Sequence, residues 1–350
     1  IAAPAAVMAV LKADAYGHGA LRVARTAVHN GASMLGVAVL SEAQALRDRG
    51  VTAPILVLGY TPAWLARDAV RADVSVALLS LDGARALSDA ALALSRPKAR
   101  GHIKVDTGMH RLGIAPEEVV PFAQAVSALP GVEIEGLFTH FAAADEADES
   151  YTRLQLSRFE RVLAEWEAAG LPRPRLVHAA NSAATLRFAE ARFDMVRTGI
   201  ALYGLDPSGE VRCPDGFRPA LALKTQLAQV REIEPGEPVS YGRTWTARRR
   251  TRLGVLPIGY ADGFRRAPAN WGEVLVRGAR VPLVGRVCMD MCTVDVTDVP
   301  AARVGDEVVL IGEQQGERIT AEEVAARLGT ISYEVVSQIL ARVPREAIST

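Results

Sequence analysis

Short apolar runs alternate with amphipathic stretches through the first two thirds of the chain. The runs are rich in Val, Ile and Leu and too short for helices, so they predict buried strands; they are Val7–Leu11, Met34–Leu40, Ile55–Gly59, Val74–Leu79, His102–Val105, Ile134–Thr139, Arg175–His178 and Met195–Ile200. The stretches between them have helical spacing, for example Ser41–Arg49, Glu117–Ala128 and Tyr151–Ala169. Eight strands alternating with helices predict an α/β fold, a (β/α)8 barrel of TIM type over residues 1–215. The main alternative, an open doubly wound sheet, has a G-x-G-x-x-G loop after its first strand, and that motif is absent.

The pattern changes after about Gly216. Helical stretches give way to short strands separated by Gly- and Pro-containing turns; these strands are Leu221–Val230, Arg252–Pro257, Glu273–Val276, Arg280–Val284, Cys292–Asp295 and Glu307–Ile311. One late helix is expected at Ala321–Leu328. We therefore predict a separate, mostly-β C-terminal domain over residues 216–350.

Composition narrows the classes of protein and partner. Lys plus Arg and Asp plus Glu both number 40, so no basic surface is expected to attract nucleic acid. No apolar run reaches the roughly 18 residues of a membrane-spanning helix, so no membrane association is expected. The three cysteines, Cys213, Cys288 and Cys292, do not form a disulfide framework and fit a cytoplasmic protein. Their spacing lacks a second Cys or His pair, so no metal site is predicted. The chain starts at Ile1 with a strand almost at once, and we expect a further N-terminal segment to precede it.

The stretch MAVLKADAYGHG, residues 8–19, places a lysine at the end of the first predicted strand. The apolar run stops at Lys12, and Gly17-His18-Gly19 predicts a turn before a helical segment. Apolar side chains packed beneath a lysine disfavour its ammonium form and lower its pKa, as a Schiff-base lysine requires. Tyr16, four positions on, can offer its hydroxyl to a ligand held there. The alternative is a lysine whose ammonium group extends from the strand end into solvent.

Polar residues also follow four later strands, at the end of the barrel where such folds carry their chemistry. They are Lys104, Asp106 and Arg111 after the fifth strand, His140 after the sixth, His178, Asn181 and Ser182 after the seventh, and Arg197 and Gly199 at the eighth. Loops after the seventh and eighth strands commonly bind phosphate, and the Ser182 hydroxyl and the backbone near Gly199-Ile200 suit that role. A reactive lysine opposite a phosphate site fits a cofactor that is both an aldehyde and a phosphate ester, such as pyridoxal 5′-phosphate.

Eight motifs, in this order, resemble the motif series of the alanine racemases, which are fold-type III pyridoxal-phosphate enzymes: KADAYGHG, KVDTGMHRLG, THFAAADE, VRTGIALYG, VSYGRTWTA, PIGYADG, GRVCMD and YEVVSQILARVPR. The resemblance covers nearly the whole chain. It implies an isomerase (EC 5.1.1.1) that interconverts L-alanine and D-alanine and supplies D-alanine for the peptidoglycan of the cell wall. It also implies a cytoplasmic homodimer whose active sites are shared between subunits.

By this resemblance, Lys12 holds the cofactor as a Schiff base and is one of two catalytic bases. The other is Tyr241, supplied by the partner subunit, because inverting a stereocentre needs proton removal on one face and delivery on the other. A tyrosine is a poor base unless its phenolate is stabilised, and the family links His140 and Arg197 to it for that purpose. From the residues alone, Tyr241 could instead pack a turn, and Arg197 could pair with Asp194.

The resemblance also implies that Arg197 contacts the pyridine nitrogen. Because arginine keeps its proton, the ring stays a weaker electron sink, which favours proton return over transamination. For the substrate, the resemblance implies that Arg111 and the Met289 backbone bind the carboxylate and that Tyr260 lies at the entrance. Lys104 is implied to be a carbamylated lysine that fixes Arg111, and His178 a cofactor-site residue that supports Arg197. The other implied cofactor contacts are Tyr16, Asn181, Ser182, Gly199, Ile200 and Tyr333.

Three other functions remain open at this stage. The first is a racemase of serine or of several amino acids, since the sequence does not reveal the rim of the pocket. The second is a fold-type III amino-acid decarboxylase, which Arg197 and the Tyr241 motif disfavour. The third is a non-catalytic pyridoxal-phosphate carrier, and the β-rich domain disfavours it because such carriers tend to be a barrel alone.

Overall fold

The computed structural model describes residues 1–348. It divides into two compact units, Ile1–Phe217 and Arg218–Thr350. The expected second domain, residues 216–350, thus ends on two residues that lie outside the described part of the chain. Within residues 1–348, no helix is both long and apolar enough to cross a membrane.

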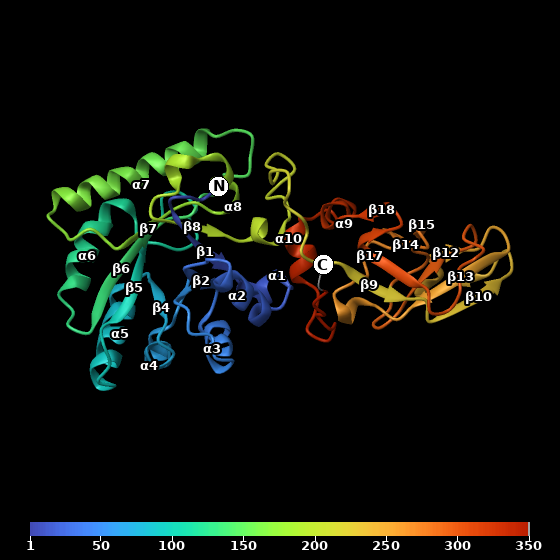
Figure 1. The fold of residues 1–350 in the computed structure, drawn as a ribbon, viewed down its shortest axis with the longest axis horizontal. Coiled ribbons are helices and arrows are strands. Elements are labelled where there is room, and N and C mark those ends of the chain that lie inside the picture. Colours follow the sequence, from blue (N-terminus) through green and yellow to red (C-terminus); the bar gives the residue numbers. More distant parts are fainter. Residues whose placement is uncertain (349–350) are drawn as a thin grey trace. The chain divides into compact units, whose positions relative to one another are not determined.

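The first unit is a barrel of eight parallel strands (Figure 1). Their bounds are β1 Ala6–Val10, β2 Met34–Val37, β3 Ile55–Val57, β4 Ser75–Leu78, β5 Ala99–Lys104, β6 Val132–Phe138, β7 Leu176–His178 and β8 Met195–Thr198. They are ordered β7-β6-β5-β4-β3-β2-β1-β8. Between β7 and β8, Asp194 N–H donates to Val177 O (3.0 Å) and Arg197 N–H donates to Ala180 O (2.9 Å). The predicted (β/α)8 fold is therefore confirmed.

Helices and single turns connect the strands of the barrel. They are α1 Lys12–Tyr16, α2 Ala20–His29, α3 Leu40–Asp48, η1 Ala63–Leu65, α4 Ala66–Arg71, α5 Leu81–Ala93, η2 Pro116–Glu118, α6 Val119–Ser127, α7 Ser150–Ala168, α8 Ser182–Arg187, η3 Ala189–Ala191 and η4 Ile200–Tyr203. Buried Met8, Met34, Leu56 and Met195 form one cluster of the core on neighbouring strands. Burial of such side chains from water is what drives these short apolar runs together.

The strand predictions are correct in position and err at the ends. Three predicted strands run at least two residues too far: β2 ends at Val37, β3 at Val57 and β8 at Thr198. After β2 and β8, Leu40 and Ile200 already begin the next turns of helix. Two strands start earlier than the apolar pattern indicates, β5 at Ala99 and β6 at Val132. The polar residues Arg100 and Glu133 are paired with each other in that ladder, so apolar content alone does not mark its beginning.

The second unit is built mainly of short antiparallel strands. They are β9 Leu223–Gln226, β10 Gln229–Ile233, β11 Pro238–Val239, β12 Trp245–Thr246, β13 Thr251–Leu256, β14 Glu273–Val276, β15 Ala279–Pro282, β16 Cys292–Asp295, β17 Glu307–Gln314 and β18 Glu317–Ile319, with η5 Tyr241–Arg243, η6 Tyr260–Asp262, α9 Ala321–Leu328 and α10 Ser332–Ser337. Val239, Leu253 and Val284 form a small core cluster there. The predicted mostly-β domain is confirmed.

Two expectations for this unit are wrong. The single strand expected at Leu221–Val230 is two strands, because the chain changes partner at its middle: β9 pairs with β17, whereas β10 pairs with β13. The late helix α9 has the predicted bounds, but a second short helix, α10, follows it. Its pattern is too short to be detected by helical periodicity.

Candidate active site

Strand β1 carries Lys12 to the carboxyl end of the barrel, and the chain then turns with left-handed helical geometry. Residues 13–16 all have φ between 53° and 55°. Each L-residue in that conformation costs roughly 1–2 kcal/mol, and such strain persists only where the surroundings enforce it. Here Ala15 N–H donates to Leu11 O (2.8 Å), and Glu42 Oε1 accepts from Ala13 N–H (2.6 Å). The enforced turn places Tyr16 beside the strand that carries Lys12.

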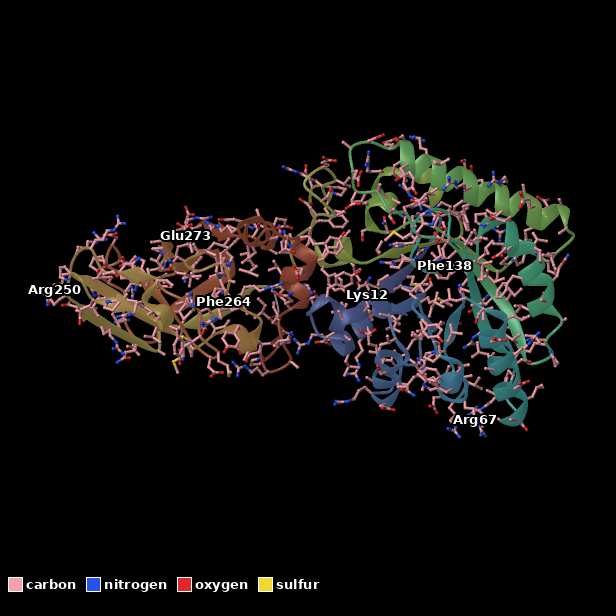
Figure 2. The ribbon with its side chains drawn as sticks, turned by 180° about the vertical axis from the view of Figure 1, so that it is seen from behind. Lys12, Arg67, Phe138, Arg250, Phe264 and Glu273 are labelled. Carbon is pink, nitrogen blue, oxygen red and sulfur yellow. The ribbon has the colours of Figure 1, made fainter. Side chains whose placement is uncertain are left out.

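The amine of Lys12 lies in a cationic environment. Figure 2 labels Lys12 at the turn after β1. Its side chain is partly exposed, yet the surrounding protein lowers its pKa, with burial as the largest cause and the charge of Arg111 as the second. Glu42 acts in the opposite direction and Arg197 adds to the lowering. A lysine with a lowered pKa has more of the neutral amine that a nucleophile or base needs.

Lys104, at the end of β5, is a buried cation close to other cations. It is 5% exposed, and its Nζ lies 5.6 Å from the ring centroid of Phe138. Burial lowers its pKa to about 8, and Arg111 is the second cause. Arg111 also lowers the pKa of Lys12 and of His140, so its guanidinium lies within electrostatic range of all three groups. The structure therefore brings these predicted residues together.

Asp106 has a local role that the sequence does not reveal. Its Oδ1 accepts from the backbone N–H groups of Gly108 (3.1 Å) and His110 (2.9 Å). These bonds shape the loop that carries Arg111 after β5. Asp106 thus shapes this loop, and its charge also raises the pKa of Lys104, against the effect of Arg111.

Ser182, after β7, and Gly199, after β8, lie close to Tyr16, which ends α1 after β1. Ser182 Oγ accepts from Gly199 N–H (2.9 Å) and from Ala201 N–H (3.3 Å). A Cβ on Gly199 would lie 2.4 Å from the Tyr16 hydroxyl, so only glycine allows the tyrosine to approach. Burial raises the pKa of Tyr16, so its hydroxyl stays a neutral donor. The two backbone N–H groups are thus bonded to Ser182, and the hydroxyls of Ser182 and Tyr16 are the kind of donor that suits a phosphate.

Asn181 and Ile200 flank this group. Asn181 Oδ1 caps α8 by accepting from Ala184 N–H (2.9 Å), so this oxygen is already engaged. Ile200 is fully buried and begins η4. Both residues lie where the sequence predicts a cofactor site, but the contact shown for Asn181 is structural.

Arg197, on β8, is the centre of a buried hydrogen-bond cluster. Its Nη1 donates to His178 Nδ1 (3.0 Å) and to His178 O (3.1 Å). Its Nη2 donates to His140 Nδ1 (3.1 Å) and to the carbonyls of Thr139 (2.7 Å) and Ala179 (2.9 Å). Burial lowers the pKa of Arg197 to about 9. Among residues 1–348, no acceptor is bonded to its Nε.

The alternative ion pair between Arg197 and Asp194 does not form. Asp194 pairs with Arg173 (2.9 Å) and accepts from Val177 N–H (2.8 Å). It lies just before β8, whereas Arg197 is the third residue of that strand. In the described part of the chain, no carboxylate pairs with Arg197, so its charge is compensated by carbonyl and imidazole acceptors only.

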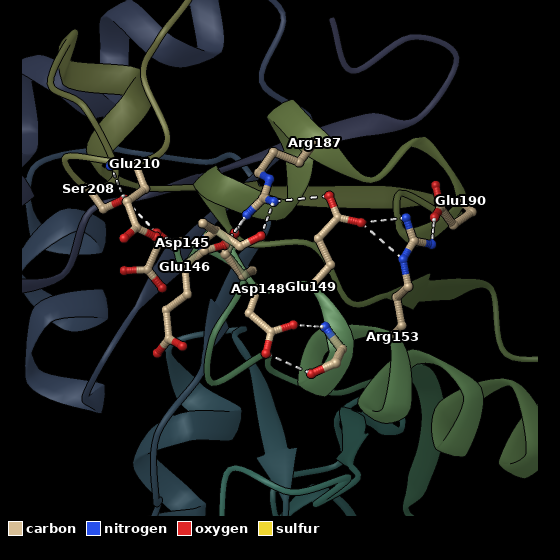
Figure 3. Close-up of polar contacts among 12 residues, drawn as sticks. Asp145, Glu146, Asp148, Glu149, Arg153, Arg187, Glu190, Ser208 and Glu210 are labelled. Atoms are coloured by element: carbon tan, nitrogen blue, oxygen red, sulfur yellow. Dashed lines mark hydrogen bonds and ion pairs between the residues drawn. The ribbon is translucent and has the colours of Figure 1, made fainter.

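The loop that follows His140 is held in place by two helices. Arg187 of α8 donates to Ala144 O (3.2 Å) and to Glu149 Oε1 (3.0 Å), as Figure 3 shows for the glutamate. Gln155 of α7 donates to the carbonyl oxygen of His140 (3.1 Å). Burial and the neighbouring cations, Arg197 first, lower the pKa of His140 well below its usual value. His140 is therefore a fixed, neutral imidazole.

Comparison with known proteins identifies the family. One family model, the alanine racemase N-terminal domain, matches residues 1–207, and another, the alanine racemase C-terminal domain, matches residues 220–347. The curated alanine racemases of Desulfovibrio desulfuricans and Desulfosudis oleivorans are 49% and 51% identical to this chain. Those alignments cover 96% and 97% of this chain and 89% of each relative. The chain belongs to the alanine racemase family.

Solved structures of alanine racemases have the same fold. That from D-cycloserine-producing Streptomyces lavendulae matches with a TM-score of 0.94 at 40% identity, covering 100% of this chain and 92% of that one. That from Bacillus anthracis, with bound L-Ala-P, matches with a TM-score of 0.91 at 40% identity, covering 97% of this chain and 87% of that one. The family and the enzyme class predicted from the sequence are thereby confirmed.

The remaining site residues predicted from the alanine racemase motifs lie in the second unit. Tyr241 begins η5 and is 68% exposed, so it does not pack a turn. Tyr260 N–H donates to Cys288 O (3.0 Å), which places Tyr260 beside the segment of Met289. The guanidinium of Arg266 lies 5.8 Å from the Tyr241 ring and 5.9 Å from the Tyr260 ring.

These second-unit side chains present polar and apolar surface to solvent. Met289 is 53% exposed, whereas Tyr333, in α10, is half-buried.

Two further buried residues of the alanine racemase barrel, Phe138 and Glu135, lie on β6, and Glu135 was not singled out from the sequence. Phe138, labelled in Figure 2, stacks on His178 with ring centroids 4.9 Å apart. Glu135, 6% exposed, lies on the same strand within an apolar run. A charged residue inside such a run is the feature that could have revealed it, because carboxylates are rarely buried unless they are paired.

Proposed function

We propose that this protein is a pyridoxal-phosphate-dependent racemase that interconverts L-alanine and D-alanine by a two-base mechanism. The observation that carries the proposal is the cluster centred on Arg197, because it combines a buried cation without a carboxylate partner with a nearby lysine of lowered pKa. Membership of the alanine racemase family supports the same reaction.

The described residues fit the cofactor at both of its ends. Tyr16 and Ser182, with the backbone near Gly199 and Ile200, would hold its phosphate, and the space left by the missing Cβ of Gly199 admits the tyrosine. Lys12 would hold its aldehyde carbon. Ile200, Asn181 and Tyr333 stay predicted cofactor neighbours. When bound, the cofactor withdraws electrons from the substrate and so acidifies the Cα–H bond.

Arg197 would direct its Nε–H at the pyridine nitrogen. Its five donated bonds from Nη1 and Nη2 hold the guanidinium in one orientation. A pKa of about 9 leaves it protonated at neutral pH, so it donates and does not accept. The pyridine nitrogen then remains unprotonated, which favours return of the proton to Cα over side reactions.

His140 would stabilise the phenolate form of Tyr241. Arginine can only donate, so His140 Nδ1 must accept from Arg197, and the single proton of the neutral ring lies on Nε2. That N–H is available to the phenolate oxygen of Tyr241. Tyr241 and Lys12 would then act on opposite faces of Cα, so that one of them removes the α-proton while the other delivers a proton to the opposite face.

Arg111 would bind the substrate carboxylate, assisted by the backbone of Met289, with Tyr260 at the entrance. A guanidinium offers a planar fork of donors to such an anion. Lys104, with its pKa lowered to about 8, has enough neutral amine to react with carbon dioxide. A carbamate there would replace a like-charge contact with an attractive one beside Arg111. This modification stays a prediction, as does a cytoplasmic location.

A direct assay tests the proposed reaction. With added pyridoxal phosphate, the protein should convert either enantiomer of alanine to an equal mixture, since enantiomers have equal free energy. Serine supplied at the same concentration distinguishes a strict from a broad racemase. Release of carbon dioxide without inversion would instead indicate a decarboxylase. Racemisation of alanine fits a role in supplying D-alanine for peptidoglycan.

We also propose a homodimer whose two sites each take Tyr241 and Met289 from the partner subunit. Mixing Lys12→Ala protein with Tyr241→Phe protein should restore activity, because one site of each heterodimer then holds both bases. Random exchange should give about a quarter of wild-type activity. Each variant taken alone through the same exchange is the control and should stay inactive. A mixture that stays inactive although heterodimers are detected contradicts the shared site.

A further inference from the structure

A hydrogen-bonded chain continues from Arg197 into the interior of the barrel. His178 Nε2 contacts His102 Nδ1 (2.9 Å), and His102 Nε2 contacts Glu135 Oε2 (3.0 Å). Ser75 Oγ donates to the same carboxylate oxygen (2.5 Å). Ser75, His102, Glu135, His178 and Arg197 lie on five consecutive strands, β4 to β8. His102 and His178 are fully buried, so no bulk water competes for these contacts.

Two local features of the backbone make room for this chain. The pairing of β5 with β6 shifts between Gly101 and His102, which leaves Glu135 as the extra residue of a bulge. Bulges re-aim side chains and are frequent beside active sites. At the next residue, Gly136, a Cβ would lie 2.2 Å from His102 Nδ1, so only glycine leaves space for the imidazole. The carboxylate and the ring are thus placed by specific departures from regular strand geometry.

The chain allows only one direction of proton donation. The bonds from His102 and Ser75 hold the pKa of Glu135 at about 2 despite its burial, so it is ionised and can only accept. His102 must therefore carry its proton on Nε2 and accept at Nδ1. Burial lowers the pKa of both histidines, so each is neutral with one ring proton. His178 then carries its proton on Nε2, and its Nδ1 accepts from Arg197.

We propose that Glu135, acting through His102, is a positioning residue that fixes the tautomer of His178 and thereby the orientation of Arg197. This inference rests on the proposed function, in which Arg197 faces the cofactor ring. With the opposite tautomer, His178 Nδ1–H would oppose the Nη1–H of Arg197, and two donors would face each other across 3.0 Å. No carboxylate of the described residues pairs directly with Arg197. Glu135 instead supplies an acceptor at the end of a hydrogen-bonded relay that runs from Arg197 through His178 and His102.

Arg175 makes the substitution Glu135→Gln informative. Arg175 is exposed and donates to Glu135 Oε1, whereas Oε2 faces His102 and Ser75. In the Gln variant, the amide oxygen should stay toward Arg175, because an amide N–H would oppose the guanidinium. The amide nitrogen then faces His102 Nε2 and donates to it. Both histidines should consequently move their protons to Nδ1.

The test uses the full chain labelled with ¹⁵N in its histidine rings. The chain has six histidines, and removing the exposed His29 and His110 by substitution simplifies assignment. Nitrogen NMR distinguishes a protonated from an unprotonated ring nitrogen. In the wild type, His102 and His178 should both be protonated at Nε2. This measurement alone can overturn the proposal, since a wild-type His178 protonated at Nδ1 contradicts it even if variants fail to fold.

The variants connect the tautomer to catalysis. Glu135→Gln should move both protons to Nδ1 and lower kcat about ten- to a hundredfold, the range for one hydrogen bond to a charged group. In the double variant Glu135→Gln/Arg175→Met, no guanidinium holds the amide oxygen, so the amide can rotate and present that oxygen to His102. The double variant should therefore regain part of the wild-type histidine protonation pattern and part of the wild-type kcat. Glu133→Gln removes an exposed carboxylate from the same strand and should change neither.

Besides a wild-type His178 protonated at Nδ1, two results would overturn the proposal: unchanged tautomers in Glu135→Gln, or changed tautomers with unchanged kcat. A wild-type protein that fails to racemise alanine contradicts the proposed function instead. In that case the ring protonation states still decide whether Glu135 sets the tautomers. The two failures are therefore distinguishable.

Discussion

Lys12→Ala is expected to abolish racemisation in both directions. Lys12 would hold the cofactor and also act as one base, and a positioned base alone contributes about 10²–10⁴-fold. The residue follows β1 in an enforced left-handed turn, and its pKa is lowered by burial and by Arg111. Removal of its side chain leaves Tyr16 and Ser182 in place, so free cofactor should still bind through its phosphate. The measurement is the rate of inversion of L- and D-alanine at saturating pyridoxal phosphate.

Borohydride reduction gives this prediction a second measurement. In the wild type, reduction should remove an absorbance near about 420 nm and link the cofactor to a lysine, as expected of a Schiff base. The chain has only four lysines, Lys12, Lys98, Lys104 and Lys224, so peptide mapping identifies the one labelled. Lys98→Ala, at an exposed position, is the matched control and should retain activity and label. Near-normal turnover by Lys12→Ala, or label on another lysine, would rule out the assignment.

Tyr241→Phe is expected to block racemisation while Lys12 still exchanges the α-proton of D-alanine. In the two-base proposal, Lys12 removes the α-proton of D-alanine and Tyr241 that of L-alanine. Loss of the phenol hydroxyl therefore removes only one base, with a cost to racemisation of about 10²–10⁴-fold. In D₂O, the variant should put deuterium on Cα of D-alanine without inverting it. L-alanine should gain almost none.

The measurement is deuterium at Cα in each recovered enantiomer, by mass spectrometry or proton NMR. Tyr60→Phe alters another exposed tyrosine, to which no role is assigned, and should racemise and label as the wild type does. Equal labelling of both enantiomers by Tyr241→Phe would mean that one base reaches both faces of Cα. The role given to Tyr241 would then be withdrawn.

The sequence by itself determined the architecture, because the hydrophobic pattern is local and periodic. Apolar runs of strand length separated by helical stretches specify eight barrel strands, and their ends place Lys12, Lys104 and Arg197 at one end of a barrel before any contact is known. Element boundaries were less certain, since the ends of β2 and β8 depend on capping and partner choice rather than on apolar content.

The motifs also determined the family, through residues distributed along the chain. They could not determine contacts, because a motif names residue types and not their neighbours. Thus the ion pair of Arg197 with Asp194 remained open in the sequence, and only the structure replaced it with His178 and His140.

The tertiary structure alone decided the left-handed turn at residues 13–16 and the buried relay to Glu135. Alanine and tyrosine do not favour positive φ, so the turn exists because distant groups such as Glu42 stabilise it. The relay joins Ser75, His102, Glu135 and His178 across about a hundred residues of sequence. Barrel closure makes these residues neighbours, and a bulge at Glu135 turns its carboxylate toward His102. Such proximity depends on the register of strands that are far apart in sequence, and no local pattern encodes it.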